Sequence, residues 1–177
     1  MLLVRALMIA LASLLVLAVA CGGDDDDDGG DGGGDEDYYN QVANLLNQAD
    51  SDVDDITSEY GGPYTDDQDE IEDTRTAINE TGRVVETLLL DLSDIEPPSE
   101  AESAHSSYLE TLQNALANFA SLSADLEDVE TKADLDAVEE QYGPIVQQHN
   151  QDVEDACLVL QGLADDAGSG ADLSCTD

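Results

Sequence analysis

The chain has 177 residues, of which 43 are acidic and only 4 are lysine or arginine, so its formal net charge at pH 7 is −39. This charge excludes nucleic-acid binding as a function, because contacts to phosphates depend on the basic residues that the chain lacks. A basic protein or divalent cations are the partners that such a charge allows. The oligomeric state does not follow from the composition.

The type of acidic residue carries further information. Aspartate outnumbers glutamate, and Lys132 is the only lysine. This composition resembles that of proteins from salt-loving organisms, in which molar salt screens the self-repulsion of the folded state. An acidic surface that serves general solubility is the alternative. The resemblance implies that added salt stabilises the fold.

The chain begins with an apolar segment that is shorter than a typical transmembrane helix. Arg5 precedes it, and no charged residue occurs from Ala6 to Ala20. A spanning helix needs about 20 apolar residues, whereas the apolar part of a secretory signal needs about 7 to 15. We therefore predict a signal peptide at residues 1–20.

The end of this segment, Leu17-Ala18-Val19-Ala20-Cys21, resembles the lipobox of bacterial lipoproteins. Ala18 departs from the leucine that is more common at its position. The resemblance implies that the Cys21 thiol carries a diacylglycerol and becomes the mature N-terminus, which anchors an extracytoplasmic protein to the cell membrane. The alternatives are an uncleaved signal anchor, which also leaves the rest of the chain outside, and cleavage to a soluble product. The leaflet is not determined.

Residues 21–37 follow as a linker. After the cysteine they contain only glycine, aspartate and one glutamate, which predicts a disordered acidic chain with a reach of about 20 to 25 Å. Part of it matches the spacing of a calcium-binding loop. The matching residues are Asp24, Asp26, Asp28, Gly29 and Asp35. No helix precedes them, so we expect no more than weak association with divalent cations.

Residues 38–166 show an apolar repeat of about 3.5 residues, which predicts amphipathic helices. Gly61-Gly62-Pro63, Pro97-Pro98 and a turn near residue 130 divide the repeat into four runs. Short connections favour antiparallel neighbours, so we predict an all-α, up-down-up-down four-helix bundle. The alternative is an elongated three-helix coiled coil with the first helix loosely docked. A polar tail, residues 167–177, follows.

Local signals predict where the helices start and bend. Thr65 and Ser99 each precede a glutamine or glutamate at capping-box spacing, and Thr131 is expected to cap the fourth helix. Gly143-Pro144 predicts a kink or short break in that helix. The fourth apolar stripe is predicted to contain Leu135, Val138, Tyr142, Ile145, His149, Val153, Ala156, Leu160 and Leu163.

Two cysteines remain after Cys21, and an even number in an exported chain indicates a disulfide. We predict that Cys157 and Cys175 pair and hold the tail against the fourth helix. A loop of this length is worth about 3 kcal/mol in the loop-entropy model. Two free thiols are the alternative.

The two histidines, His105 and His149, occupy apolar-stripe positions. Glu102 and His105 form a Glu-x-x-His pair that resembles half of the motif in ferritin-like metal bundles. The matching position before His149 is Val146, and the expected register does not bring the two histidines together. We therefore predict buried histidines that are satisfied by hydrogen bonds, with copper, zinc or haem ligation as the alternative.

The segment Leu92–Tyr108, with its Ile-x-Pro-Pro turn, resembles uncharacterised helical lipoproteins of bacterial envelopes, a group that implies a location but no activity. No nucleophile elbow, phosphate-binding glycine loop or HExxH motif occurs. We predict a non-enzymatic structural or interaction module of the cell envelope that needs no cofactor. A bundle that binds a metal, a haem or a basic peptide is the alternative.

Overall fold

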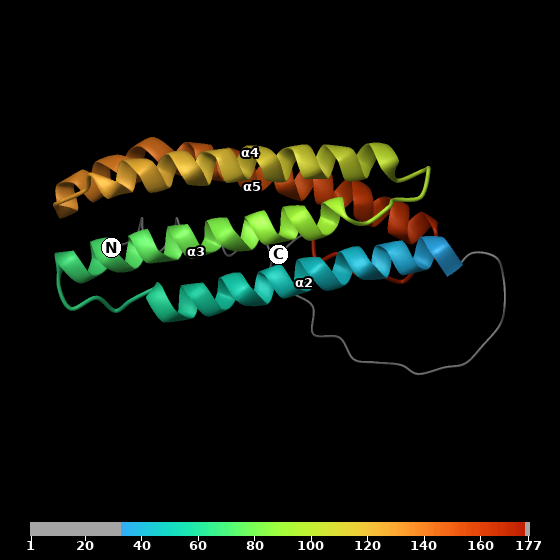
Figure 1. Cartoon of the computed structure of the whole chain (residues 1–177), viewed down its shortest axis with the longest axis horizontal. Helices are drawn as coiled ribbons and strands as arrows, with labels where there is room; N and C mark the ends of the chain where they lie inside the picture. Colours follow the sequence, from blue (N-terminus) through green and yellow to red (C-terminus); the bar gives the residue numbers. More distant parts are fainter. Residues whose placement is uncertain (1–32, 176–177) are drawn as a thin grey trace.

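The computed structural model describes residues 33–175, and these residues form four helices with no strand. Figure 1 shows the helices in chain order. They are α2 (Gly33–Tyr60), α3 (Asp67–Ser93), α4 (Glu102–Glu127) and α5 (Lys132–Asp166). The predicted all-α class is therefore confirmed.

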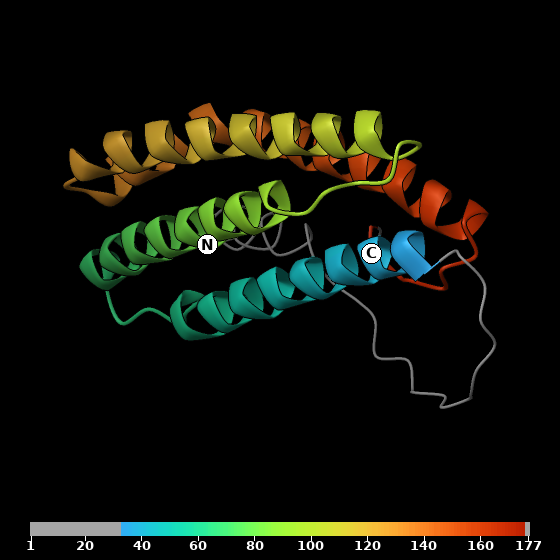
Figure 2. The same cartoon turned by 45° about the vertical axis from the view of Figure 1, so that its right-hand side comes forward.

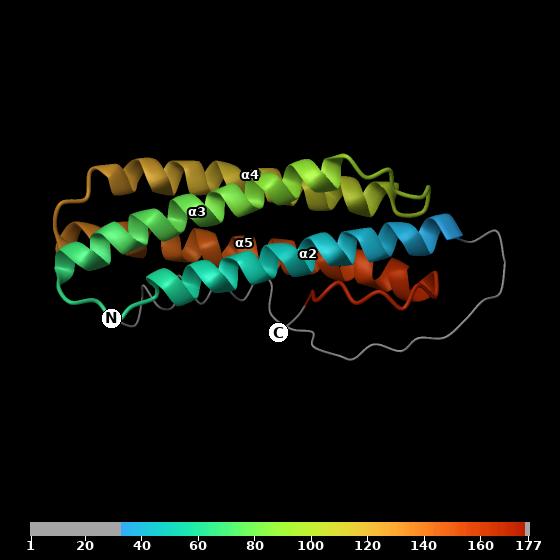
Figure 3. The same cartoon turned by 60° about the horizontal axis from the view of Figure 1, so that its bottom comes forward.

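The helices pack as antiparallel neighbours in chain order. α3 packs against both α2 and α4, and α4 packs against α5 (Figures 1 and 2). This is the predicted bundle, and α2 is not loosely docked, because Tyr38 and Tyr39 in its first turns are almost completely buried. α2 rests mainly on α3, and the segment after α5 returns along the side of α5 that faces α2 (Figure 3).

The bundle is elongated, and its two ends differ. One end holds the start of α2, the connection between α3 and α4, and the end of α5, while the opposite end holds the connections 61–66 and 128–131 (Figure 1). The longest helix, α5, has 35 residues and is therefore about 50 Å long. Among the described residues, no helix combines the length and apolar composition that crossing a bilayer requires.

The core is mainly aliphatic, and the predicted stripe in α5 needs correction. Ile145 is 39% exposed, whereas its neighbour Val146 is 9% exposed. The stripe is displaced by one residue at four places, where the buried residues are Glu139, Val146, Cys157 and Ala164. Hydrophobicity alone favoured Val138 over Glu139, because a pattern of side-chain types does not predict burial of a charged residue.

The predicted linker is too long at its C-terminal end. α2 begins at Gly33, before the predicted start at Tyr38, so residues 33–37 are helical. Glu36 and Asp37 lie near the helix N-terminus, where negative charge is favourable to the helix dipole. The packed residues that follow therefore extend the helix into a segment that has no apolar residue of its own.

Two of the three predicted caps are wrong. Asp66, and not Thr65, caps α3, accepting hydrogen bonds from the backbone N–H groups of Gln68 and Asp69. At the start of α4 no side chain caps the helix. There the Pro98 carbonyl accepts from two backbone N–H groups that follow it, so the turn supplies the partner that Ser99 was expected to provide.

The fourth helix has the predicted cap but no break. Thr131 and Asp134 form a reciprocal capping box at the start of α5. The helix then continues through Gly143-Pro144 to Asp166. A proline removes one backbone hydrogen bond, and burial on both sides of Pro144, at Tyr142 and Val146, maintains the helix across this position.

Candidate functional site

The predicted lipid-attachment residue, Cys21, lies outside the described residues. The same is true of the signal peptide at residues 1–20 and of most of the calcium-loop pattern, whose last member, Asp35, is in the first turn of α2. The candidate functional groups that the structure describes are the cysteine pair, the two histidines and a cluster of buried charges.

Cys157 and Cys175 form a disulfide, the pairing that the sequence predicts. Their Cα atoms are 5.3 Å apart, and their sequence separation is 18. Cys157 projects from α5 and is 4% exposed. The bond therefore fixes the C-terminal tail to the interior side of α5.

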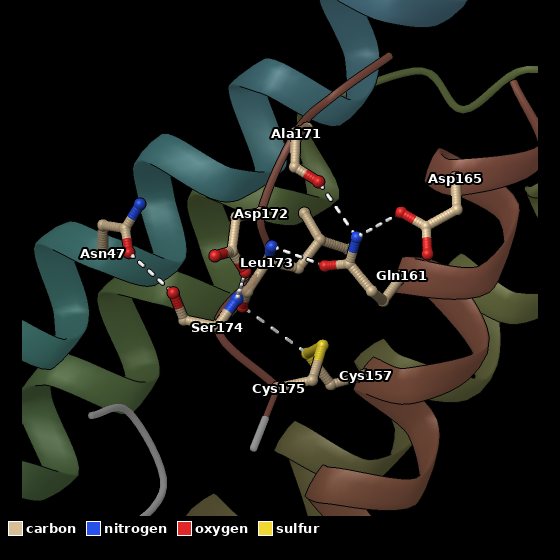
Figure 4. The surroundings of a disulfide bond; sticks show 9 residues. All are labelled: Asn47, Cys157, Gln161, Asp165, Ala171, Asp172, Leu173, Ser174 and Cys175. Atoms are coloured by element: carbon tan, nitrogen blue, oxygen red, sulfur yellow. Dashed lines mark hydrogen bonds between the residues drawn. A yellow bond between two sulfur atoms is a disulfide. The ribbon is translucent and has the colours of Figure 1, made fainter. Parts of the chain in front are cut away.

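The segment after α5 was predicted to be a polar tail, but it also contributes an apolar side chain to the core. Leu173 is 1% exposed and belongs to the same hydrophobic core as the helices. Figure 4 shows the tail passing between α5 and α2, with Ser174 directed toward Asn47 of α2. An extended segment thus fills the space between two helices that have few direct contacts with each other.

Gln161 of α5 binds the backbone of this tail. Its amide nitrogen donates to the Ala171 carbonyl at 3.0 Å, and its amide oxygen accepts from the Leu173 N–H at 2.7 Å (Figure 4). The same amide nitrogen also donates to Asp165. One side chain therefore satisfies both a donor and an acceptor of the extended tail, as a neighbouring strand would.

His105 is buried between three helices. Its Nδ1 lies 2.9 Å from the Tyr38 hydroxyl of α2. Burial lowers the pKa of His105, and a hydrogen bond with the Leu92 backbone of α3 partly offsets this effect. Glu102 is exposed whereas His105 is buried, so the Glu-x-x-His spacing, which resembles half of a metal-binding motif, does not bring these two side chains into one buried site. His105 acts as a neutral link between α2, α3 and α4.

His149 lies in a small apolar crevice between α4 and α5, beside Phe119 and Leu122. The side chain is 9% exposed, and its Nε2 has no hydrogen-bond partner within the described part of the chain. Burial lowers the pKa of His149, and Asp152 partly offsets this. The accessible volume of about 20 Å³ has room for about one water molecule, and is too small for a haem or another organic cofactor.

The structure does not bring the two histidines together. His149 faces α4 near Phe119, whereas His105 is near the start of α4 and contacts Tyr38. Within the described residues, no three histidine, cysteine, aspartate or glutamate side chains are grouped so that they could hold a metal ion. The geometry therefore does not favour the metal-binding alternative at His105, His149 or Glu102.

A cluster of buried charged residues lies toward the end of the bundle that holds the connections 61–66 and 128–131, and it was not predicted from the sequence. Glu70 of α3 and Glu139 of α5 are 6% and 3% exposed. Lys132 places its Nζ 3.5 Å from Oε1 of Glu70 and also pairs with Asp136. Burial raises the pKa of Glu139, Lys132 opposes the rise, and Asp136 and Glu70 add to it. The scarcity of lysine was the only sequence signal for this cluster.

Arg75 has a structural role at the same end. Its guanidinium donates to the Leu126 carbonyl at 2.7 Å, to the Glu127 carbonyl at 3.3 Å and to the Val129 carbonyl. These carbonyls lie at the C-terminus of α4 and just beyond it, where a helix has unsatisfied acceptors and a negative dipole. Arg75 therefore caps α4 from the neighbouring α3.

A wider groove of about 180 Å³ lies between α2 and α3. Arg83 borders it, together with the acidic residues Asp52 and Asp91, above apolar side chains such as Leu45 and Leu88. The two carboxylates outweigh the one guanidinium, so the groove does not attract anions.

Comparison with known proteins gives no match to a family model, a curated protein or a solved structure.

Proposed function

We propose that this protein is a lipid-anchored, extracytoplasmic, non-catalytic module that projects an acidic helical rod from the cell membrane. The proposal joins the lipobox-like sequence ending at Cys21 with the direction of α2. α2 begins at one end of the elongated bundle and leads away from that end (Figure 1). A tether that enters there holds the rod by its end. This entry point is the single observation that carries the proposal.

The opposite end would then face away from the membrane. It consists of the connections 61–66 and 128–131, which carry exposed acidic side chains together with the helix residues next to them. These are Asp66, Asp67, Glu127, Asp128 and Glu130. The two basic residues at this end, Arg75 and Lys132, are bound to helix carbonyls or carboxylates and do not neutralise that surface. We propose that a positively charged protein segment is the partner of this acidic end.

Charge also supports an orientation away from the membrane. Bilayer surfaces that contain anionic lipids attract basic segments and repel acidic ones. A chain with a net charge of −39 therefore gains nothing by lying flat on such a surface. The lipid on Cys21 would be the only strong attachment.

Cell fractionation of cysteine variants tests the anchoring. Cys21→Ser should move the protein from the membrane fraction to the medium or the periplasm without changing its helical circular dichroism. Cys175→Ser is the matched control, because it removes a cysteine, and with it the Cys157–Cys175 disulfide, from the folded domain and should leave the protein on the membrane. Retention of the Cys21→Ser variant on the membrane would contradict lipid anchoring and support the signal-anchor alternative.

Binding at the outer end is tested separately. Oligolysine should bind the purified protein more weakly when Asp128 and Glu130 are changed to Asn and Gln. Asp155 and Glu154, two exposed acidic residues of α5 far from these connections, provide the matched double variant. Equal loss in both variants would indicate a nonspecific charge effect and would contradict a partner site at this end.

A further inference from the structure

The tail after α5 reverses direction and becomes extended. Gly168 and Gly170 both have positive φ angles, +69° and +65°, a conformation that glycine adopts without steric cost. The reversal returns residues 171–175 along α5 on the side facing α2 (Figures 3 and 4). The tail therefore covers the seam between these two helices.

Few non-covalent contacts hold the tail in this place. Leu173 and Ala171 are its buried apolar side chains. Gln161 binds the backbone of residues 171 and 173, Ser169 donates to the Ala164 carbonyl near the end of α5, and Ser174 donates to Asn47 on α2 at 3.2 Å. The net free energy that one hydrogen bond contributes is smaller than the conformational-entropy cost of ordering the residue that forms it. The covalent link is therefore the main constraint on the tail.

The helices do not depend on the tail in the same way. α2 packs on α3, α3 on α4, and α4 on α5, and each of these interfaces is formed by helix residues alone. Tyr38 also binds His105 across the bundle at 2.9 Å. Removal of the tail leaves these contacts in place.

We infer that residues 167–175 form a disulfide-held strap over the α2–α5 seam, and that reduction of Cys157–Cys175 by a dithiol opens the strap while the four helices stay folded. The inference does not depend on the proposed lipid anchor. Opening uncovers α5 around Cys157, whose Sγ lies 3.7 Å from the Leu173 carbonyl oxygen, together with the facing part of α2 at Asn47.

The chemistry is a thiol–disulfide exchange. A thiolate of the dithiol attacks Sγ of Cys175, which is the half-buried member of the pair, and Cys157 is 4% exposed. The S–S bond breaks, Cys157 leaves as a thiolate and takes a proton, and a mixed disulfide forms on Cys175. The second thiol of the dithiol then displaces Cys175, so the dithiol becomes a disulfide and the protein holds two thiols.

Hydrogen exchange of the purified full chain, with and without dithiothreitol, tests this inference. The Leu173 N–H, which donates to Gln161, should exchange about 100-fold faster after reduction, the factor that corresponds to the loss of a loop constraint of this size. Backbone N–H groups at Val42 and Leu112, in the cores of α2 and α4, should keep their protection. Cys175→Ser should show fast exchange at Leu173 without any reductant.

A second variant separates the covalent link from the packing. Leu173→Ala keeps the disulfide but removes most of the buried side chain of the tail, so the N–H of residue 173 should stay protected in the oxidised protein and lose protection only after reduction. Unchanged protection of Leu173 after complete reduction would overturn the inference, because the strap would then be held without the disulfide. Loss of protection at Val42 and Leu112 together with Leu173 would also overturn it, because the tail would then be part of the cooperative fold.

Discussion

Nζ of Lys132 lies 3.5 Å from Oε1 of the buried Glu70, so the only lysine of the chain is used inside the protein, between α3 and α5. Arg75 is used in a similar way, because it caps the carbonyls at the end of α4. Among the described residues only Arg83 is a basic side chain without such a contact. The acidic character of the surface therefore follows from the placement of the basic residues as well as from their number.

Arg75 and Arg83 form a matched pair for a stability test. Arg75→Ala removes hydrogen bonds from a charged donor to three carbonyls, at Leu126, Glu127 and Val129, and should lower the free energy of unfolding by about 2 kcal/mol. Arg83→Ala changes the same charge on the same helix and should stay within about 0.5 kcal/mol of the parent. Urea unfolding followed by circular dichroism measures both. Equal losses would show that Arg75 acts through net charge and not as a cap.

Glu139 should make the protein less stable as the pH rises. Its native pKa is above the ordinary value of 4.5, chiefly because of burial. At pH values between 4.5 and the raised native pKa, the native state therefore binds more protons than the unfolded state. The free energy of unfolding falls as the pH increases through this range. Glu139→Gln should remove this part of the pH dependence. The exposed Glu140→Gln is the control, and an equal change in that variant would count against the role of burial.

His149 should have the opposite effect at mildly acidic pH. Burial lowers its native pKa below the ordinary value of 6.5, so the unfolded state binds more protons just below that pH. The free energy of unfolding should therefore fall as pH drops through 6.5 toward the native pKa. His149→Leu should reduce this slope and, because it also removes a buried Nε2 that lacks a hydrogen bond, raise stability by about 1 kcal/mol. His105 has the same sign of shift, so part of the slope should remain. A variant with the parent slope would contradict a buried neutral His149.

Salt should stabilise the fold strongly. A formal charge of −39 destabilises the compact state through self-repulsion, and the Debye length shortens from about 10 Å at 0.1 M to about 3 Å at 1 M salt. The midpoint of thermal unfolding should rise steeply between low and molar NaCl. Sucrose at equal osmolarity tests for general effects on hydration. A midpoint that is the same at both salt concentrations would contradict the resemblance to proteins of salt-loving organisms.

The sequence predicts the helices well because each one repeats a local pattern many times. The third run of the apolar repeat is buried at every position, in α4 and just beyond its two ends, at Ala101, His105, Tyr108, Leu112, Ala115, Phe119, Leu122, Leu126 and Val129. Features determined by a few residues were harder to predict. Thr65 and Asp66 are both acceptable caps, and only the backbone conformation at Asp66, with φ −155° and ψ 178°, decides between them.

The sequence could not predict contacts that join distant segments. Glu139 shares the buried end of the bundle with Lys132 of the same helix and with Glu70 of α3, and the residues around Glu139 in the sequence do not indicate that Glu70 lies there. Leu173 lies in a segment of mostly small and polar residues. Its burial depends on a space between α2 and α5 that exists only after the helices have packed.

The mass of the mature N-terminal peptide tests the central claim most directly. Mass spectrometry of protein extracted from the membrane of its native host should find a peptide that begins at Cys21 and carries a diacylglycerol. A peptide that still contains residues 1–20, or an unmodified N-terminus after cleavage, would contradict the lipid-anchored account.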